Sequence, residues 1–316
     1  MSERILEIAN PARLSIKDAQ LVIEREGFPR FVTPVCELNT VLLAHPQVTL
    51  TEAVLSRLAE AGAMLVAIDH RYLPAAMMLP IQIHSLQTER LGAQVRLKPV
   101  IRKRLWQQIV RAKIHFQATW LNELQGSDGG LKALVARVRS GDPENLEAQA
   151  AQRYWKRLFA DSKFRRNPGP FAPGLDQNRH LNYGYTLLRA SMARAICAAG
   201  LHPSLGLHHH NRYDSFCLAD DLMEPFRLLI DRRIVFWLMH HSADAPFDSA
   251  AKKWLIEAVT MRYETGKEAR TLSDILFRTA SSLVAVLCEK CNQLDFPEFL
   301  TPCQEESIYP PTGVCG

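Results

Sequence analysis

Short runs of β-prone residues, separated by turn formers, occupy the start of the chain. The runs cover residues 4–8, 13–16, 21–24, 30–33 and 41–43. Gly27 and Pro29 are among the breaks between them. One helical pattern then begins at Thr51 and stops at Gly62, and a strand pattern follows at 64–68. These features predict a small β-rich domain over residues 1–80, β-sandwich-like with one helix.

After Pro99 the pattern changes to an almost unbroken succession of helices. In the first, over 100–124, apolar residues such as Leu105, Ile109 and Phe116 recur near the helical period. Further helices are predicted at 131–138, 145–159 with Asn145 as its cap, 182–199, 223–240, 250–263 and 272–287. We expect a linker over 81–95, an all-α catalytic domain over 96–300 and a loose tail over 301–316. The fold class is therefore α+β.

Composition and cysteine usage favour a soluble cytoplasmic protein. No apolar run approaches the length of about 18 residues that spans a membrane, and the N-terminus lacks the apolar stretch of a secretory signal. Seven cysteines form no regular framework, which is typical of a reducing compartment. Cys288 and Cys291 form a lone CxxC without a second pair at zinc-site spacing. We expect no zinc site there, with Cys288 in a helix core.

Positive charge is concentrated in the second part of the chain. Residues 1–90 hold 8 of the 38 Lys and Arg residues, and the 91–120 segment holds no acid at all. One acid-poor cluster lies in this segment, and a second lies at 153–166, where Asp161 is the one acid. The residues proposed to contact nucleic acid are Arg102, Lys103, Arg104, Arg153, Lys156, Arg165 and Arg166. A polyanionic partner is the simplest use for two such faces. The alternative is that each run is an ordinary solvated helix face.

The densest group of potential metal ligands lies in the 206–227 segment. His208–His210 precede Asp220, Asp221 and Glu224. The pattern predicts that Asp221 and Glu224 share a face in the first turn of a helix capped by Asp220. One imidazole with two carboxylates is a mixed nitrogen and oxygen ligand set, which favours Mg²⁺ or Mn²⁺. The competing interpretation is a solvated histidine turn that binds nothing.

Glu147 is a further candidate ligand, in the predicted helix at 145–159. It falls on the same side of that helix as Ala151, Tyr154 and Leu158, and hence towards the apolar face. An unpaired buried carboxylate is costly, and a metal ion or an arginine would offset that cost. The alternative is an ordinary glutamate near a helix N-terminus.

Several of these motifs resemble the CRISPR-associated integrase family (Cas-one), which inserts new spacers into CRISPR arrays. GLHHHNRY at 206–213 and DLMEPFR at 221–227 are similar to the C-terminal signature of its type II branch, with His209 fifteen residues before Glu224. EAQAAQRYW at 147–155 resembles the glutamate signature of the family, and NRHLNYGY at 178–185 resembles a third segment. The resemblance covers essentially the whole chain.

The resemblance implies a metal-dependent DNA endonuclease and integrase of adaptive antiviral immunity. Glu147, His209 and Glu224 would be the catalytic ligands of one Mg²⁺ or Mn²⁺ ion, with Asp221 and His208 as supporting neighbours. The spacer 3′-hydroxyl would attack repeat phosphodiesters without a protein nucleophile. With water as the attacking group, the same site would act as a nuclease.

The resemblance also implies partners. They are double-stranded DNA, a homodimer formed through the β-rich domains, and a small protein, Cas-two, that bridges two homodimers; the type II interference nuclease would take part in selecting DNA. Tyr154, Tyr183 and Tyr185 are either stacking platforms for bases or core residues. Two other functions stay open on the residues alone: a non-catalytic basic DNA-binding scaffold subunit, and a zinc hydrolase that uses the histidine triplet.

Overall fold

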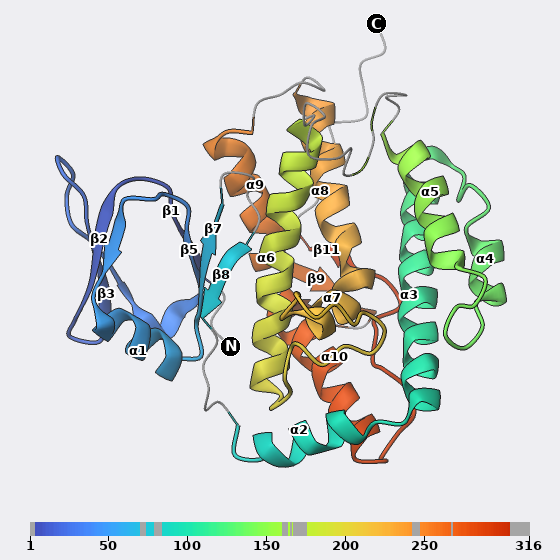
Figure 1. Ribbon diagram of the computed structural model, residues 1–316. Helices are drawn as coiled ribbons and strands as arrows, with labels where there is room; N and C mark the ends of the chain where they lie inside the picture. The colour runs from blue at the N-terminus through green and yellow to red at the C-terminus, as the bar shows by residue number, and fades with distance from the viewer. Residues whose placement is uncertain are drawn as a thin grey trace, which may run out of the picture.

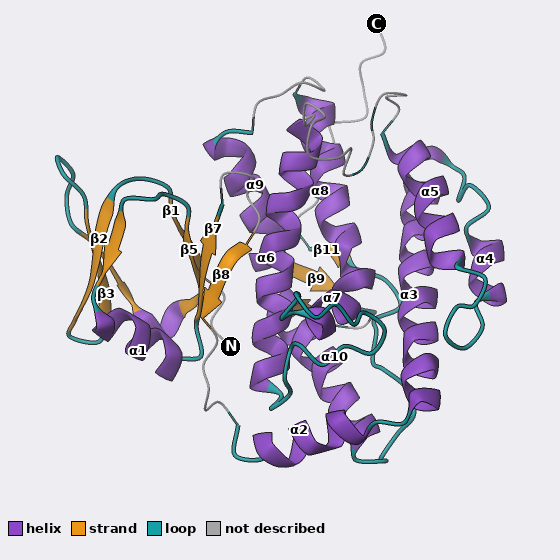
Figure 2. Cartoon of the chain, viewed as in Figure 1, coloured by secondary structure: helices purple, strands orange, loops and turns teal. Residues whose placement is uncertain are grey.

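The computed structural model describes residues 4–69, 74–78, 84–159, 164, 166, 176–241, 247–266 and 268–303. Figure 1 shows a strand-rich N-terminal unit beside a larger group of helices, and Figure 2 shows how the strands are concentrated in the first. The α+β fold expected from the sequence is confirmed. Residues 304–316 of the expected tail, residues 81–83 of the expected linker and Arg165 lie outside the described residues.

The described N-terminal unit is a sandwich of two four-stranded sheets. Its strands are β1 (Arg4–Ile8), β2 (Ala12–Lys17), β3 (Gln20–Glu24), β4 (Phe31–Pro34), β5 (Leu38–Leu43), β6 (Val48–Leu50), β7 (Met64–Ile68) and β8 (Pro74–Met78). One sheet has the order β1-β5-β7-β8 and the other β4-β3-β2-β6. A 3-10 turn, η1 (Val35–Glu37), precedes β5. Helix α1 (Glu52–Glu60) contributes Val54 and Leu58 to the core between the sheets, together with Leu14 and Leu38.

Strands β5 and β7 serve two hydrophobic cores at once. Successive side chains of a strand point to opposite faces, so neighbouring residues enter different environments. Val41 and Leu65 face each other in register and pack inside the sandwich. Leu42 and Val66, the next pair along, pack into the core of the helical domain. The first sheet is therefore covered on both faces, and the two domains share it.

The helical domain is built around one central, largely buried helix. Its elements are α2 (Gln87–Arg96), α3 (Pro99–Gln125), α4 (Lys132–Arg137), α5 (Leu146–Leu158), α6 (Asp176–Ala198), α7 (Cys217–Met223), the 3-10 turn η2 (Glu224–Phe226), α8 (Arg227–His240), α9 (Ser249–Thr260) and α10 (Leu272–Leu287). Helix α8 is buried without a break from Leu228 to Trp237, which places it at the centre. Every helix among the described residues is too short or too polar to traverse a bilayer.

Three local features differ from the sequence prediction. Most of the segment expected as a linker is helix α2, and Gln94 anchors it through hydrogen bonds in both directions with the backbone of His202. The domain expected to be all-α also contains a small sheet of β9 (Arg262–Glu264), β10 (Ala269–Thr271) and β11 (Thr301–Pro302). Cys288 is exposed, because α10 ends immediately before it.

Candidate active site

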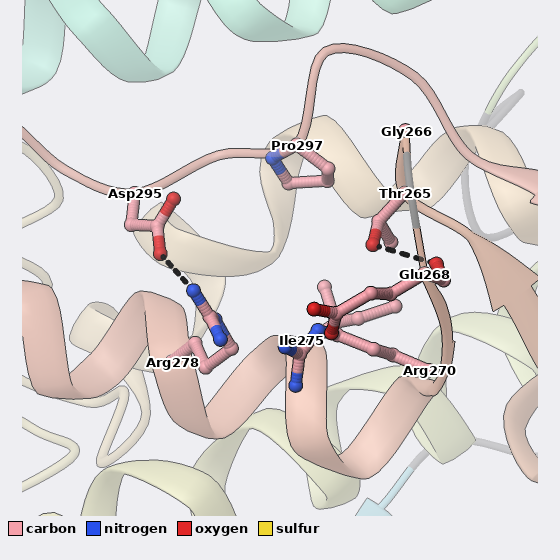
Figure 3. Close-up of a pocket in the computed structure, with 8 residues that line it drawn as sticks. All are labelled: Thr265, Gly266, Glu268, Arg270, Ile275, Arg278, Asp295 and Pro297. Carbon is pink, nitrogen blue, oxygen red and sulfur yellow. Dashed lines mark hydrogen bonds and ion pairs between the residues drawn. The ribbon is translucent and has the colours of Figure 1, made fainter.

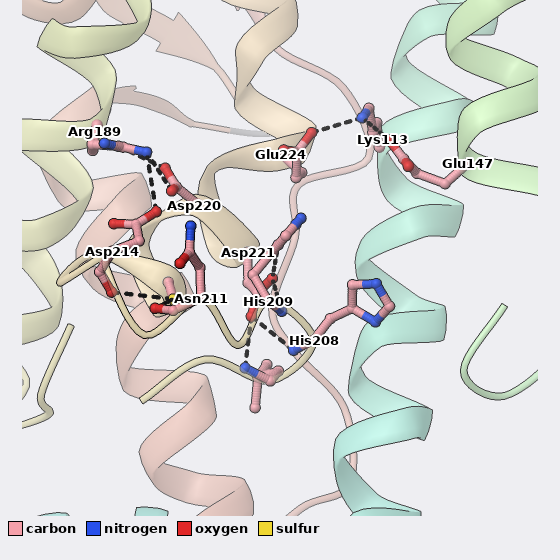
Figure 4. Close-up of polar contacts among 12 residues, drawn as sticks. Lys113, Glu147, Arg189, His208, His209, Asn211, Asp214, Asp220, Asp221 and Glu224 are labelled. Carbon is pink, nitrogen blue, oxygen red and sulfur yellow. Dashed lines mark hydrogen bonds and ion pairs between the residues drawn. The ribbon is translucent and has the colours of Figure 1, made fainter. Parts of the chain in front are cut away.

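Lys113 lies at the centre of the site, on α3, between two acidic residues. Its ammonium group forms ion pairs with Glu147, from the first turn of α5, and with Glu224 Oε2, 2.7 Å away at the start of η2. These side chains are 11%, 27% and 8% exposed, respectively. Burial alone would lower the pKa of Lys113, but the charges of Glu224 and Glu147 outweigh it and raise the pKa overall. Figure 4 shows the three side chains meeting between helices.

Glu147 owes its position to the turn that starts α5. The side chain of Asp142 accepts hydrogen bonds from the backbone N–H groups of Leu146 and Glu147, both at 2.9 Å. Asn145, expected to be the cap, has a left-handed backbone (φ 51°) and forms no side-chain bond to the helix. Asn145 therefore occupies the predicted N-cap position, but the side chain that caps the helix is Asp142, which also places negative charge at the helix N-terminus.

Glu224 is held as an anion by two cations. Its Oε1 lies 2.9 Å from the guanidinium of Arg227, and its Oε2 faces Lys113. Burial raises the pKa of Glu224, but Arg227 and then Lys113 outweigh that effect and lower the pKa to about 2. Arg227 is itself positioned over the ring of Tyr185, 4.8 Å from its centroid. Glu224 therefore stays ionised at neutral pH despite its burial.

The helix before Glu224 does not begin where the sequence suggested. Helix α7 starts at Cys217, so Asp221 lies near its end rather than in its first turn. Asp220, expected to cap that helix, is instead buried in it and accepts two hydrogen bonds from Arg189 of α6. Burial raises the pKa of Asp220 to about 6, against the opposing effect of Arg189. The difference arises because the apolar residues before Asp220 already belong to the helix.

Asp221 fastens the histidine loop. Its buried carboxylate accepts hydrogen bonds from the backbone N–H groups of Leu207 (2.6 Å), His208 (2.9 Å) and His209 (3.3 Å). His209 Nδ1 lies 2.6 Å from the same carboxylate, and this contact raises the pKa of His209. When Nδ1–H donates to Asp221, Nε2 carries the lone pair that a metal ion requires. Asp221 therefore holds both the backbone of the loop and the ring of His209.

The other two histidines of the triplet have different surroundings. His208 stacks on Trp106 of α3, with ring centroids 4.1 Å apart and planes inclined by 4°. Trp106 also meets the His209 ring edge-on at 5.6 Å, so one indole braces both imidazoles. His210 is exposed. The loop is thus held on one side by Trp106 of α3, which stacks on His208, and on the other side by Asp221 of α7.

Two of the three predicted metal ligands, Glu147 and Glu224, contact the same ammonium group. The third, His209, contacts Asp221 instead. Among the described residues, no three His, Cys, Asp or Glu side chains stand ready to hold a metal ion. The Lys113 ammonium fills the space that Glu147 and Glu224 share, and the His209 ring is directed to Asp221. The donor set of two carboxylates and one imidazole still suits Mg²⁺ or Mn²⁺ rather than a thiolate-preferring ion. The residues fit such an ion if Lys113 moves.

Of the three α3 residues proposed to contact nucleic acid, two extend to solvent and one contacts the backbone. Lys103 and Arg104 are exposed, whereas Arg102 is partly buried and directs its guanidinium to the carbonyl of Gln94 at 3.4 Å. Arg104 is nine residues before Lys113, or two and a half helical turns, so the two side chains leave α3 on opposite sides. Arg104 helps to line an open hollow of about 650 Å³ with the neighbouring arginines Arg111 and Arg139.

The second basic cluster is divided. Arg153 and Lys156 are exposed on α5, but Arg166 donates hydrogen bonds to Asn178 and Asn182 of α6, at 3.0 and 3.1 Å. These bonds engage Arg166 inside the domain. The tyrosines considered for base stacking, Tyr154, Tyr183 and Tyr185, are all buried, so that interpretation is wrong.

Sequence reasoning missed Lys113 and Trp106 as parts of the site. They are seven residues apart, two helical turns, and share the face of α3 that carries buried Ile109 and Val110. The periodicity alone therefore indicated that a lysine points into the domain. Lys113 was counted instead with the surface charges of the acid-poor segment.

A second hollow, shown in Figure 3, lies away from this centre. It has a volume of about 390 Å³ beside α10 and the turn between β9 and β10. Its charges are paired among themselves, because Arg270 contacts Glu268 and Arg278 contacts Asp295. None of the predicted site residues lines it. The candidate chemistry therefore belongs to the Lys113 centre.

The sequence matches the family model described as CRISPR associated protein Cas1 over residues 7–265. The chain belongs to the Cas1 family. It is 35% identical over 306 residues to the CRISPR-associated endonuclease Cas1 of Neisseria meningitidis serogroup C, a match that covers 95% of this chain and 97% of that relative. The family resemblance stated from the motifs is confirmed, while the type II assignment stays a prediction.

The Cas1 fold extends to solved structures of low sequence identity. A casposase bound to its integration product superposes with a TM-score of 0.74 at 19% identity, covering 93% of each chain. A chain of a Cas6-RT-Cas1–Cas2 complex gives a TM-score of 0.72 at 19% identity, covering 92% of this chain and 36% of that one. These likenesses establish a shared fold for both domains.

Proposed function

We propose that this Cas1-family protein is a metal-dependent DNA endonuclease and integrase that inserts spacer DNA into a CRISPR array. The observation that carries the proposal is the convergence of Glu147 and Glu224, from separate elements, on one charged point. The Neisseria relative, named as an endonuclease, supports phosphodiester chemistry. Integration is supported by the family motifs around these same residues.

Each residue of the centre has a defined task in this proposal. Glu147, Glu224 and His209 would hold one Mg²⁺ or Mn²⁺ ion, which when bound neutralises charge at the scissile phosphate and orients the attacking 3′-hydroxyl. Arg227 keeps Glu224 ionised and pointed into the site. Asp221 fixes the ring of His209 so that Nε2 faces away from the carboxylate.

The proposed substrate is double-stranded DNA, both as spacer precursor and as CRISPR repeat. Exposed Lys103, Arg104, Arg153 and Lys156 would contact backbone phosphates, which supply affinity without reading sequence. We further propose a homodimer and a small Cas2 partner. The Cas2 proposal is supported by the structural neighbour at 19% identity, which is a chain of a Cas6-RT-Cas1–Cas2 complex.

The test is strand transfer of a short duplex into supercoiled plasmid, with Mn²⁺ and the small partner, by Glu147→Gln. We expect this variant to lose cleavage and strand transfer by at least about a hundredfold, because a ligand is lost, while it still binds DNA. Glu144→Gln is the matched control, since Glu144 is exposed three residues earlier and pairs with Arg137 and Arg139. It should keep full activity.

A second matched pair tests the histidine. His209→Ala should lose activity as Glu147→Gln does, whereas His210→Ala should keep it, because His210 is exposed and lies outside the centre. Activity retained by both Glu147→Gln and His209→Ala would remove the metal-site assignment. DNA binding without any metal-stimulated chemistry in the wild-type protein would favour the non-catalytic scaffold subunit.

A further inference from the structure

Lys113 occupies the place where two candidate ligands of a divalent ion meet. Its ammonium contacts Glu147 and Glu224 together, and its side chain is only 11% exposed. The three residues come from α3, α5 and η2, elements that are distant in sequence. No short-range turn forces this arrangement, so packing of three elements brings one lysine between two carboxylates.

The charges at this point balance without a metal ion. Glu147 and Glu224 are opposed by Lys113 and by Arg227, which pairs with the other oxygen of Glu224 at 2.9 Å. Two carboxylates that face each other repel, and an uncompensated buried charge is strongly unfavourable. A divalent cation added to this neutral group would give an excess of positive charge. It would also need the oxygen atoms that the ammonium contacts.

We propose that Lys113 is a positioning residue that serves as a resident counter-ion. Its ammonium holds Glu147 and Glu224 in their facing arrangement before a divalent ion binds, and it leaves the shared space when the ion enters. The inference rests on the proposed metal site. It adds that the Lys113 ammonium competes with the divalent ion for the two carboxylates. Lys113 therefore sets how tightly the site binds its ion, and lowers that affinity relative to a site without the lysine.

The direct test is Mn²⁺ binding to Lys113→Met, measured by electron paramagnetic resonance of free Mn²⁺ and by thermal unfolding in EDTA. Removing the competing cation should tighten Mn²⁺ binding by about tenfold or more. The same variant should melt at a lower temperature than wild type in EDTA, because its carboxylates have lost a counter-ion. Added Mn²⁺ should therefore raise its melting temperature more than that of wild type.

Two further variants make the result specific. Lys253→Met removes an exposed lysine of α9 and should change neither measurement. Lys113→Arg restores the charge and should return both the Mn²⁺ affinity and the melting temperature in EDTA towards wild type. A lysine with a merely structural role predicts weaker Mn²⁺ binding in Lys113→Met, so unchanged or weaker binding overturns the proposal.

A measurement on wild type covers the case in which Lys113→Met does not fold. Lysine labelled with ¹³C at Cε and supplied during expression marks every lysine without changing its charge, and the Lys113 signal is assigned by its loss in Lys113→Arg. Addition of Mg²⁺ should shift that signal and leave the Lys253 signal in place, and a stationary Lys113 signal overturns the inference. Wild type that binds neither Mn²⁺ nor Mg²⁺ would refute the proposed function itself, whereas binding without Lys113 displacement refutes only this inference.

Discussion

The two domains differ in what they bury. The described sandwich buries Thr33, Asn39 and Thr40 as its polar residues, and all three are uncharged. The helical domain buries a series of charged side chains: Asp142, Arg194, Asp220, Asp221, Glu224, Asp231, Arg232 and Arg233. Burial of a charge is unfavourable unless partners compensate it. The polar residues buried in the sandwich are thus uncharged, whereas the helical domain buries charges that partners must compensate, among them Asp221 and Glu224 of the proposed metal site.

The largest effect should come from Glu224→Gln, which removes a buried charge with two cationic partners. Strand transfer should fall by at least about a hundredfold through loss of a ligand. The free energy of unfolding should also fall by about 3–5 kcal/mol, because Lys113 and Arg227 lose their counter-charge. Urea unfolding and strand-transfer assays measure the two losses.

Glu147→Gln separates these losses. Its side chain is 27% exposed, against 8% for Glu224, so it should lose activity with much less loss of stability. Equal destabilisation by the two substitutions would mean that the buried ion pairs of Glu224 contribute no more to stability than the partly exposed pair of Glu147.

In the sandwich the corresponding deletion is Leu58→Ala. Leu58 is fully buried on α1, so we expect the free energy of unfolding to fall by about 2–5 kcal/mol. Leu55→Ala, one turn away and only partly buried, should cost less. Mn²⁺ affinity of the folded Leu58→Ala protein should equal that of wild type. A weakened metal site in this variant would contradict the division of roles between the domains.

Asp221→Asn tests the support of the histidine loop. The amide keeps the shape but loses the charge that faces His209 Nδ1. We expect Mn²⁺ affinity to fall by about 10–100-fold, with activity recovered at higher Mn²⁺ concentration. Asp214→Asn, on the same loop but facing Arg189, should leave the affinity intact. Failure of excess Mn²⁺ to restore activity would point to collapse of the loop instead.

The smallest effect concerns the basic face of α3. Lys103→Ala with Arg104→Ala should reduce the salt dependence of DNA binding by up to about two phosphate contacts. Arg102 is left in place because its guanidinium is directed to the backbone of Gln94. Mn²⁺ affinity should not change, since both side chains are exposed and Arg104 leaves the helix on the side opposite Lys113. An unaltered salt dependence would show that the face does not contact DNA.

Sequence reasoning reached the ligand candidates because they lie in motifs, and it missed what surrounds them. The spacing between His209 and Glu224 identifies these two residues as candidates, and the position of Glu147 near the start of a predicted helix identifies the third. Asp142 was missed as a cap because Asn145 is nearer to α5. The left-handed backbone of Asn145 cannot be inferred from the residue type alone. Lys113 was missed because lysines on amphipathic helices usually extend to solvent. Only packing of α3 against α5 and η2 reveals its partners.

The sheet shared by the two domains has a mechanical consequence. Each of β5 and β7 sends alternate side chains into both cores, so a rotation of the sandwich against the helices would break one core or the other. The ion pair of 3.1 Å between Lys252 of α9 and Glu7 of β1 spans the same junction. The sandwich and the helical domain therefore move as one rigid body, without a hinge between them. A protein that binds the sandwich would therefore also fix the orientation of the Lys113 centre relative to the substrate.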